Sequence, residues 1–203
     1  MTRVVAVRHG ETDWNREGRM QGWAPVPVNE TGRGQATAVG RWLSDRYEFD
    51  RAFASDLARR RETAELVADA IGDLDVTLES AWRERDLGIY QGLSHERIES
   101  EHPRFGLTET AYRSTEIVPE GGESFRAVEE RVVGRFETVA GSDRETVLVI
   151  THGGPLRILL GHAKGLELST ALLEHGPENC SVTEFRIDES IEVVRENIAI
   201  PTQ

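Results

Sequence analysis

The chain alternates short continuous apolar runs with stretches in which apolar residues recur at helical spacing. The continuous runs at Thr2–Arg8 and Thr146–Ile150 predict strands that are buried on both faces. Helical spacing is clearest over Glu123–Ala140, where the apolar side chains share one face. Alternation of the two patterns predicts an α/β fold, a single three-layer α/β/α domain with a mostly parallel sheet.

Weaker signals complete the expected order of elements. Glu30–Leu43 has helical spacing, and Ser55 and Asp56 are expected to cap a helix that ends near Ile71. Residues 11–29 show no period and predict a long loop. The other expected elements are strands at Arg51–Ala54, Val76–Leu78, 180–187 and 191–198, a short helix at Ser94–Glu101 within an irregular stretch 80–122, and a helix after Pro155. No linker or repeat divides the chain, so residues 1–203 are expected to form one domain.

Two histidines occupy equivalent places in this plan. His9 follows the first strand, His152 follows the strand at 146–150, and a glycine comes directly after each. Ligands of open parallel sheets bind beyond the carboxyl ends of the strands, and glycine lets an anion approach the backbone. Pro155 suits the first turn of a helix whose free N–H groups attract phosphate. One such histidine is more often a packed structural residue, but two in matching contexts favour a functional site.

Composition narrows the possible partners. The net charge of −12 disfavours nucleic acids and anionic membranes, and an anionic substrate would need a local arginine cluster to outweigh the overall field. The single cysteine, Cys180, excludes an internal disulfide and a multi-cysteine zinc site. The N-terminal apolar run is too short for a signal peptide or a membrane span, so a soluble, cytoplasmic protein is expected.

Lysine is almost absent. Lys164 is the one lysine among 24 basic residues, and acidic residues are in excess. This composition resembles that of cytoplasmic proteins from microbes that accumulate salt. A GC-rich genome that favours arginine codons explains it equally well, and both explanations stay open.

A series of motifs follows in order along nearly the whole chain. They are Arg8-His9-Gly10-Glu11-Thr12-Asp13-Trp14-Asn15, Gly18-Arg19-Met20-Gln21-Gly22, Asn29-Glu30-Thr31-Gly32, Ser55-Asp56-Leu57-Ala58-Arg59 with Glu62-Thr63-Ala64, Arg83-Glu84, Gly121-Gly122-Glu123-Ser124 and Thr151-His152-Gly153-Gly154. The series resembles the signature of the histidine phosphatase superfamily, also called phosphoglycerate mutase-like. Asp56, Val28 and Asn29 depart from the usual pattern, but none of them removes a chemical group from the expected mechanism.

The resemblance implies metal-independent phosphoryl transfer through a phosphohistidine. His9 would attack phosphorus, with its other ring N–H held by a backbone carbonyl such as that of Gly10. Arg8 and Arg59 would bind the phosphate oxygens, and a protonated His152 would stabilise the transferring group. Glu84 would protonate the leaving oxygen and later accept a proton from water. No metal and no cofactor is expected.

Two of these assignments have plain structural alternatives. Arg59 begins the run Arg59-Arg60-Arg61, and runs of charge are usually solvated faces. Glu84 lies among several charged residues, so its assignment depends on the resemblance.

Other residues are expected around the substrate. Asn15, Gln21 and Gly22 lie on the long loop and, with Gly153, would orient the phosphate or the organic part of the substrate, although turn chemistry explains the loop residues too. Trp14 and Trp23 are equally plausible as loop anchors or as substrate contacts. His95, His102, His162 and His175 match no motif and are expected to be structural or surface residues.

The superfamily contains phosphatases and mutases. The stretch from Gly92 to Gly122 is short and lacks the mutase pattern, and the motif at Gly18–Gly22 is more typical of the phosphatase branch. We therefore expect a phosphatase that acts on a small phosphorylated metabolite, with a 2,3-bisphosphoglycerate-dependent phosphoglycerate mutase, a non-catalytic phospho-ligand binder and a protein phosphatase as alternatives. The physiological substrate and the oligomeric state stay open.

Overall fold

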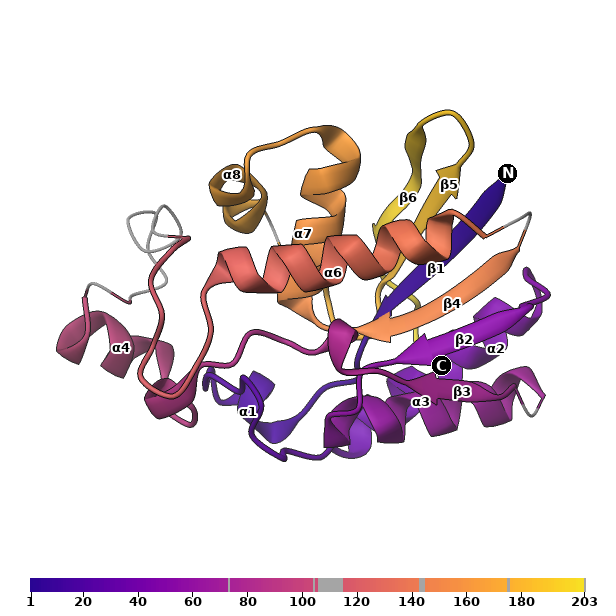
Figure 1. Cartoon of the computed structure of the whole chain (residues 1–203). Coiled ribbons are helices and arrows are strands. Elements are labelled where there is room, and N and C mark those ends of the chain that lie inside the picture. Colours follow the sequence, from indigo (N-terminus) through magenta and orange to yellow (C-terminus); the bar gives the residue numbers. More distant parts are fainter. Residues whose placement is uncertain (73, 104, 106–114, 143–144, 175, 203) are drawn as a thin grey trace.

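A six-stranded sheet runs through the molecule in the order β3-β2-β4-β1-β5-β6 (Figure 1). The computed structural model describes all residues except 73, 104, 106–114, 143–144, 175 and 203. The strands are β1 (Thr2–Arg8), β2 (Arg51–Ala54), β3 (Val76–Leu78), β4 (Thr146–Thr151), β5 (Val182–Ile187) and β6 (Ile191–Ile198). β1 to β4 are mutually parallel, and β5 pairs antiparallel with both β1 and β6, so among the strands of the described residues β5 alone runs against the others. The expected α/β fold with a mostly parallel sheet is confirmed.

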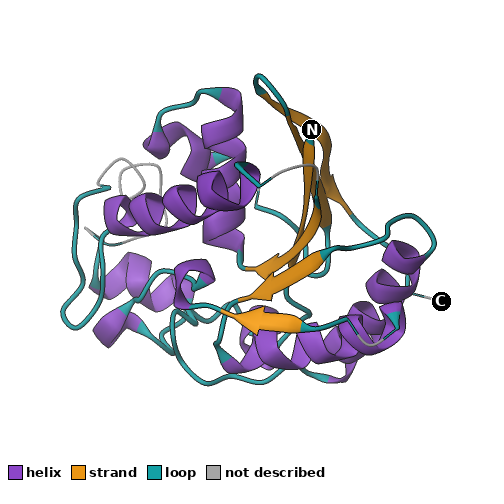
Figure 2. Cartoon of the chain, turned by 45° about the vertical axis from the view of Figure 1, so that its right-hand side comes forward, coloured by secondary structure: helices purple, strands orange, loops and turns teal. Residues whose placement is uncertain are grey.

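Helices cover both faces of the sheet (Figures 1 and 2). One face packs against α2 (Glu30–Ser44) and α3 (Ala58–Ile71), and the other against α6 (Phe125–Ala140) and α7 (Gly153–Lys164). The other helices of the described residues are α1 (Asp13–Arg16), α4 (His95–Glu101), α8 (Leu168–Leu173) and the 3₁₀ turns η1 (Ser80–Trp82) and η2 (Gly88–Tyr90). None of the helices in the described ranges has the length and apolar character that a membrane span requires.

Strand alternation explains why the sheet needs two layers of helices. Along β1, Val4 and Ala6 face the α6–α7 side, and Val5 and Val7 face the α2–α3 side. All four side chains are fully buried. A continuous apolar run therefore supplies both cores, as the sequence pattern indicated.

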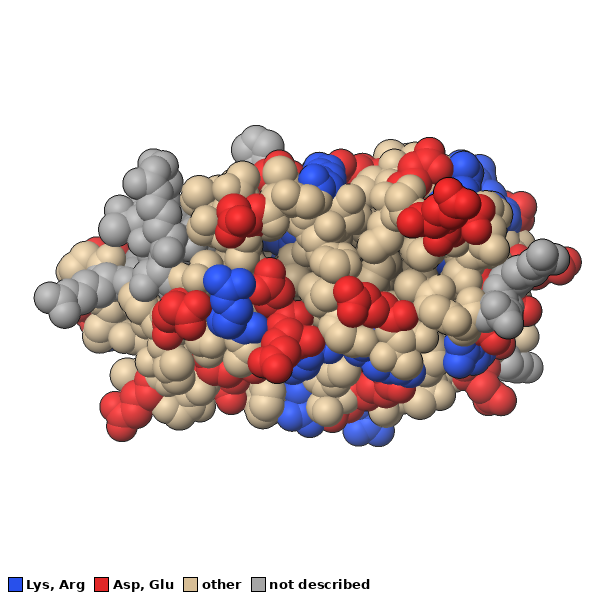
Figure 3. Space-filling view, turned by 45° about the horizontal axis from the view of Figure 1, so that its top comes forward, with Lys and Arg blue, Asp and Glu red and all other residues tan. Residues whose placement is uncertain are grey.

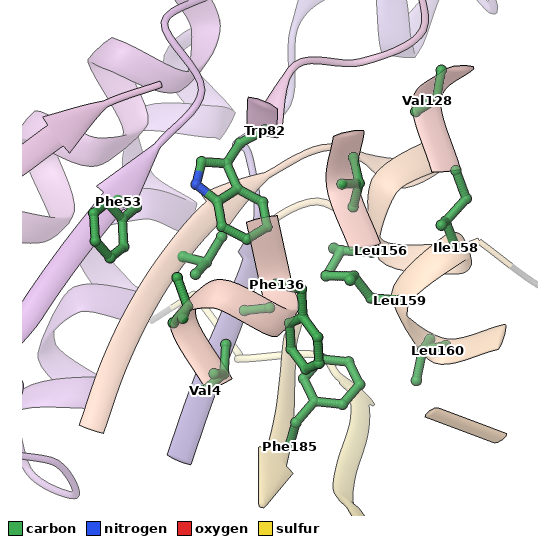
Figure 4. Packing of buried hydrophobic residues seen from close by; sticks show 14 of the residues in the cluster. Val4, Phe53, Trp82, Val128, Phe136, Leu156, Ile158, Leu159, Leu160 and Phe185 are labelled. Atoms are coloured by element: carbon green, nitrogen blue, oxygen red, sulfur yellow. The ribbon is translucent and has the colours of Figure 1, made fainter. Parts of the chain in front are cut away.

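The core on the α6–α7 side is built around aromatic side chains (Figure 4). Phe136 of α6 and Phe185 of β5 meet edge to face with ring centroids 5.3 Å apart. Trp82 is fully buried near the carboxyl end of β4, where its carbonyl accepts a hydrogen bond from Thr151 Oγ1 at 2.8 Å. This contact ties the η1 turn to the strand that leads to His152.

Several helices begin or end at residues that the sequence marks as caps. Asn29, Ser94 and Ser124 cap α2, α4 and α6 through side-chain hydrogen bonds, and Gly72 ends α3 with φ 114°. The expected Ser55–Asp56 cap is wrong: the N-cap of α3 is Leu57, without a side-chain bond.

Two further expectations need correction. The stretch 11–29 is not all loop, because Thr12 and Asn15 close a capping box around the short helix α1. α8 was not predicted from the sequence pattern. Part of the irregular stretch 80–122, residues 104 and 106–114, lies outside the described residues.

Charged side chains are scattered over the surface. In Figure 3, acidic side chains are spread over the face in view, with basic side chains among them. Most ion pairs in the described residues join partly exposed partners, such as Arg97 and Glu101 at 2.9 Å. Such pairs contribute little individually, so the stability of the fold comes chiefly from its two apolar layers.

We expect Phe136→Ala to lower the free energy of unfolding by about 3–5 kcal/mol, because it leaves a cavity against Phe185 in a close-packed core. Urea denaturation followed by circular dichroism measures the change. Thr138→Ala on the exposed face of the same helix is the control, with a change within about 0.5 kcal/mol. Equal effects of the two substitutions would contradict the assigned core.

Candidate active site

The carboxyl ends of β1 and β4 bring the two strand-end histidines together. Arg8 pairs with Thr151 in the parallel register, and His9 N–H donates to the Thr151 carbonyl at 3.1 Å. The rings of His9 and His152 lie 5.8 Å apart, and both residues are buried. A pocket of about 250 Å³ opens beside them. The site lies where an open parallel sheet places its ligands, as expected.

His9 is held as a neutral imidazole with one nitrogen free. Its Nδ1–H donates to the Gly10 carbonyl at 2.6 Å, the kind of contact that the sequence predicted. This bond fixes the tautomer, so Nε2 carries a lone pair. Burial, followed by the positive charges of Arg60, Arg8 and Arg59, holds the pKa of His9 well below its usual range. His9 is therefore uncharged at neutral pH and chemically suited to act as a nucleophile.

The backbone after His9 is fixed by close packing. Gly10 N–H donates to Thr63 Oγ1 at 3.1 Å, and Thr63 in turn donates to the Arg59 carbonyl at 2.7 Å. A Cβ at Gly10 would overlap the Gly32 carbonyl. Glycine is thus required by the contact between the His9 loop and the start of α2.

His152 has a defined tautomer as well. Arg59 Nη2 lies 3.2 Å from His152 Nδ1, and because a guanidinium only donates, Nδ1 must accept. The proton is then on Nε2, which donates to Ser55 Oγ at 3.0 Å. In this ligand-free arrangement His152 is neutral, whereas the sequence analysis expected it protonated when phosphate is bound.

Arg8 and Arg59 are two of the arginines that line the pocket. Arg59 is buried and donates to the carbonyls of Gly22 at 2.6 Å and Ala24 at 3.1 Å, which ties the long loop to α3. Arg8 donates to the Pro177 carbonyl. Burial lowers the pKa of both, that of Arg59 to about 10, so both stay charged. Nε of each is buried without a hydrogen-bond partner among the described residues.

Glu84 is anchored on the first turn of α7. Its Oε2 accepts from Gly154 N–H at 3.1 Å, and its Oε1 accepts from Arg85 N–H at 2.9 Å. The carboxylate therefore occupies one of the helix N–H groups that the sequence analysis expected to attract phosphate. A Cβ at Gly154 would overlap the Glu84 carboxylate, so glycine at this position is a condition for its placement.

The backbone of Glu84 is held from two sides. Its carbonyl accepts from Trp23 Nε1 at 2.7 Å and from Arg131 Nη2 at 3.0 Å. Arg83 forms a two-point ion pair with Asp56, at 2.5 and 2.6 Å, and stacks on the Trp23 ring. Trp23 does not line the pocket, which favours its interpretation as an anchor.

The outer part of the pocket is mixed in character. Asn15, Gln21, Gly22 and Gly153 line it, as expected for substrate-binding residues. Asn15 Oδ1 accepts from Asn179 Nδ2 at 3.3 Å, and Asn179 also donates to the His9 carbonyl at 2.9 Å. The apolar part of the described lining includes Met20, Leu87, Phe125, Leu172 and Pro177.

Positive charge is concentrated at this pocket despite the acidic composition of the chain. The described lining includes Arg8, Arg19, Arg59, Arg85 and Arg157, against the single acid Glu84. The local field therefore attracts anions in a protein whose net charge is −12. This is the arginine cluster that an anionic substrate was expected to require.

A model of the histidine phosphatase superfamily (branch 1) matches residues 4–198 of the chain. The chain belongs to the histidine phosphatase superfamily. The match spans both strand-end histidines and all the motifs that carried the resemblance.

Relatives of this histidine phosphatase include phosphatases and mutases. It is 35% identical over 162 residues, 79% of this chain and 70% of the relative, to phosphoglycerate mutase-like protein 4 of Arabidopsis thaliana. It is 36% identical over 161 residues, 78% of this chain and 67% of the relative, to a metal-independent phosphoserine phosphatase of the same plant. Bacterial 2,3-bisphosphoglycerate-dependent phosphoglycerate mutases are similar too.

Its fold is shared with a mycobacterial glucosyl-3-phosphoglycerate phosphatase solved as a complex with VO3. The TM-score is 0.84 at 30% identity, covering 97% of this chain and 98% of that one. The family and these relatives class this histidine phosphatase as a phosphomonoester hydrolase.

The structure brings the sequence-predicted site residues of this histidine phosphatase together. Arg8, His9, Asn15, Gln21, Gly22, Arg59, Glu84 and Gly153 line the pocket, and His152 lies directly behind it. Their chemical roles remain predictions. His95 is exposed, in line with its expected surface place, and it also borders the pocket, whereas His175 lies outside the described residues.

Sequence reasoning missed Ser55, Thr63 and Asn179, the partners of His152, Gly10 and His9. Ser55 and Thr63 belong to the sequence motifs around Arg59, each four positions from it, and this spacing could have indicated them. Asn179 is separated from His9 by 170 positions, and no local pattern marks it.

We expect Gly154→Ala to displace the Glu84 carboxylate and to reduce kcat/KM for an alkyl phosphate by about 100-fold, since misplacement of about 1 Å has this effect on catalysis. Gly134→Ala is the matched control, because nothing lies within 4 Å of the added Cβ. Steady-state phosphate release measures both. An unchanged rate in Gly154→Ala would show that Glu84 is not placed by this contact.

Proposed function

We propose that this histidine phosphatase hydrolyses small phosphomonoesters without a metal, through a phosphohistidine on His9. The observation that carries the proposal is the state of His9: its Nδ1–H is held by the Gly10 carbonyl, its Nε2 has no hydrogen-bond partner among the described residues, and it faces a pocket lined by arginines. A phosphoryl group needs charge neutralisation and in-line attack more than it needs further covalent chemistry. The arginines would supply the charge neutralisation, and His9 Nε2 would supply the attacking lone pair.

In the first half-reaction, His9 Nε2 would form a bond to phosphorus as the bond to the ester oxygen breaks. Arg8 and Arg59, whose buried Nε groups lack partners among the described residues, would donate to the phosphate oxygens. Glu84 would transfer a proton to the departing oxygen and release the alcohol. The products are phosphohistidine, a free alcohol and an ionised Glu84.

In the second half-reaction, Glu84 would accept a proton from water as that water attacks phosphorus, restoring His9 and releasing inorganic phosphate. His152 would stabilise the transferring group. Its hydrogen bonds to Ser55 and Arg59 hold the ring in place, and a bound phosphate dianion would favour its protonated form.

The pocket supports a small substrate. Its volume of about 250 Å³ is below the range of about 300–1,000 Å³ that is usual for drug-sized ligands. Its apolar lining and the flanking arginines suit a phosphorylated metabolite rather than a long polymer.

A phosphoglycerate mutase is the second candidate, favoured by the mutases among the relatives. A mutase would return the phosphoryl group of His9 to a second oxygen of a phosphoglycerate and would need a bisphosphoglycerate primer. Conversion of 3- to 2-phosphoglycerate with and without primer, set against phosphate release, separates the two activities. A ligand binder would bind phosphate esters without either reaction.

We expect His9→Ala to abolish phosphate release from a panel of phosphomonoesters that includes 3-phosphoglycerate and an aryl phosphate, with chelator present throughout. The wild-type protein should remain active and should be labelled by a ³²P-substrate in an acid-labile, base-stable linkage, as a phosphoramidate requires. His162→Ala on α7, which does not line the pocket, is the control. Chelator-sensitive release, or full activity in His9→Ala, would overturn the proposed mechanism.

Glu84→Gln should separate substrates by their leaving groups. An alkoxide needs the proton of Glu84, so we expect release from alkyl phosphates to fall by about 10²–10⁴-fold. An aryl phosphate with an acidic phenol should still phosphorylate His9 and give a burst of phenol, followed by slow turnover, because Glu84 is also the base for water. Rapid-mix absorbance measures the burst, and Glu130→Gln on the exposed face of α6 is the control. Equal slowing of both esters without a burst would contradict the role of Glu84.

A further inference from the structure

Arg60 is a fully buried arginine that the reaction described above does not use. It follows Arg59 on α3, and its relative exposure is 0%. Its Nε–H donates to the Thr151 carbonyl at 3.0 Å. Both terminal nitrogens, Nη1 and Nη2, are buried and make no hydrogen bond within the described part of the chain.

The Thr151 carbonyl links Arg60 to both catalytic strand ends. The same oxygen accepts the backbone N–H of His9 at 3.1 Å, and His152 is the next residue along the chain. Arg60 therefore connects α3 to the carboxyl ends of β1 and β4, which the two histidines directly follow.

An unpaired buried charge is costly, and a guanidinium keeps its charge in proteins. Burial and the neighbouring Arg59 lower the pKa of Arg60, whereas Glu84 acts in the opposite direction. A cost of this kind in a native fold needs a compensating function. A doubly negative phosphoryl group at the pocket would provide compensation whenever substrate or product is bound.

We propose that Arg60 is a positioning residue for phosphoryl transfer: it fixes the strand ends through Thr151 and adds a third buried positive charge that keeps His9 neutral and favours phosphate binding. The inference rests on the proposed function of His9. Among the described residues, the charged or titratable groups around His9 include Arg8 from β1, Arg59 and Arg60 from α3, Glu84 from the loop after η1, His152 at the start of α7, and Cys180 before β5. Among the positive charges, Arg60 has the largest effect on the pKa of His9.

The direction of the effect follows from the sign of the charge. A cation beside His9 disfavours the imidazolium, so its removal raises the pKa of His9 and moves the acid limb of kcat/KM to higher pH. Neutral His9 would then be lost at mildly acidic pH, where the wild-type protein still carries it. Phosphate affinity should fall as well, because one of the buried positive charges beside His9 is gone.

The test compares Arg60→Met, Arg60→Lys and, as a matched control, Arg61→Met, whose side chain is the exposed neighbour on the same helix. Three readouts are the His9 titration in the ligand-free protein by NMR, the acid limb of kcat/KM, and the affinity for inorganic phosphate by calorimetry. Arg60→Met should raise the pKa of His9 and the pH of the acid limb of kcat/KM by about one unit each. It should also weaken phosphate binding about tenfold. Because lysine keeps a positive charge, Arg60→Lys should leave the pKa of His9 close to its wild-type value. Arg61→Met should match wild type in all three readouts.

Thermal unfolding distinguishes this role from a structural one. Replacing an unpaired buried charge by an apolar side chain of similar volume is often neutral or stabilising, so the Tm of Arg60→Met should equal or exceed that of wild type. Failure of Arg60→Met to fold, or a His9 titration equal to that of Arg61→Met, would overturn the inference. If wild type releases no phosphate while the His9 titration still shifts, the proposed function fails and the effect of Arg60 on His9 stands.

Discussion

The site depends on the parallel pairing of β1 with β4. Their register sets Arg8 opposite Thr151, and the hydrogen bond from His9 N–H to the Thr151 carbonyl carries that pairing one residue beyond the strand. Two segments separated by more than a hundred positions therefore end at the same edge of the sheet. A shift of one residue would turn His9 to the opposite face, because strand side chains alternate.

Helix α3 holds the two strand ends and the long loop in place around the pocket. Arg59 reaches the His152 ring and the loop carbonyl of Gly22, and Thr63 holds the Gly10 backbone. A single helix thus holds the His9 loop in place and carries the Arg59 guanidinium beside it. The buried cations also tune the site, since they keep His9 neutral in a chain whose overall charge is strongly negative.

The Glu84 carboxylate is held by a different part of the fold. Glu84 belongs to an irregular segment, but its carboxylate accepts from Gly154 N–H on α7, and its carbonyl accepts from Trp23 and Arg131. Loops that carry function in this way need a rigid frame around them. The long loop, α6 and α7 together provide that frame. They explain why Glu84 is held in place although the charged sequence around it is typical of an exposed surface.

The sequence by itself predicted most of the elements and most of the residues that meet at the pocket. Strand and helix periods predicted the sheet and its helices, since local burial patterns depend on neighbouring residues, and the glycines after His9 and His152 marked the site. It did not distinguish Arg59 and Arg60 from the exposed Arg61, because three adjacent arginines look alike until helix packing buries two of them. Only the tertiary structure decided the tautomer of His152, which depends on contacts with Arg59 and Ser55 from elsewhere in the chain. Protonation and orientation follow from such long-range contacts and burial, which local sequence does not encode.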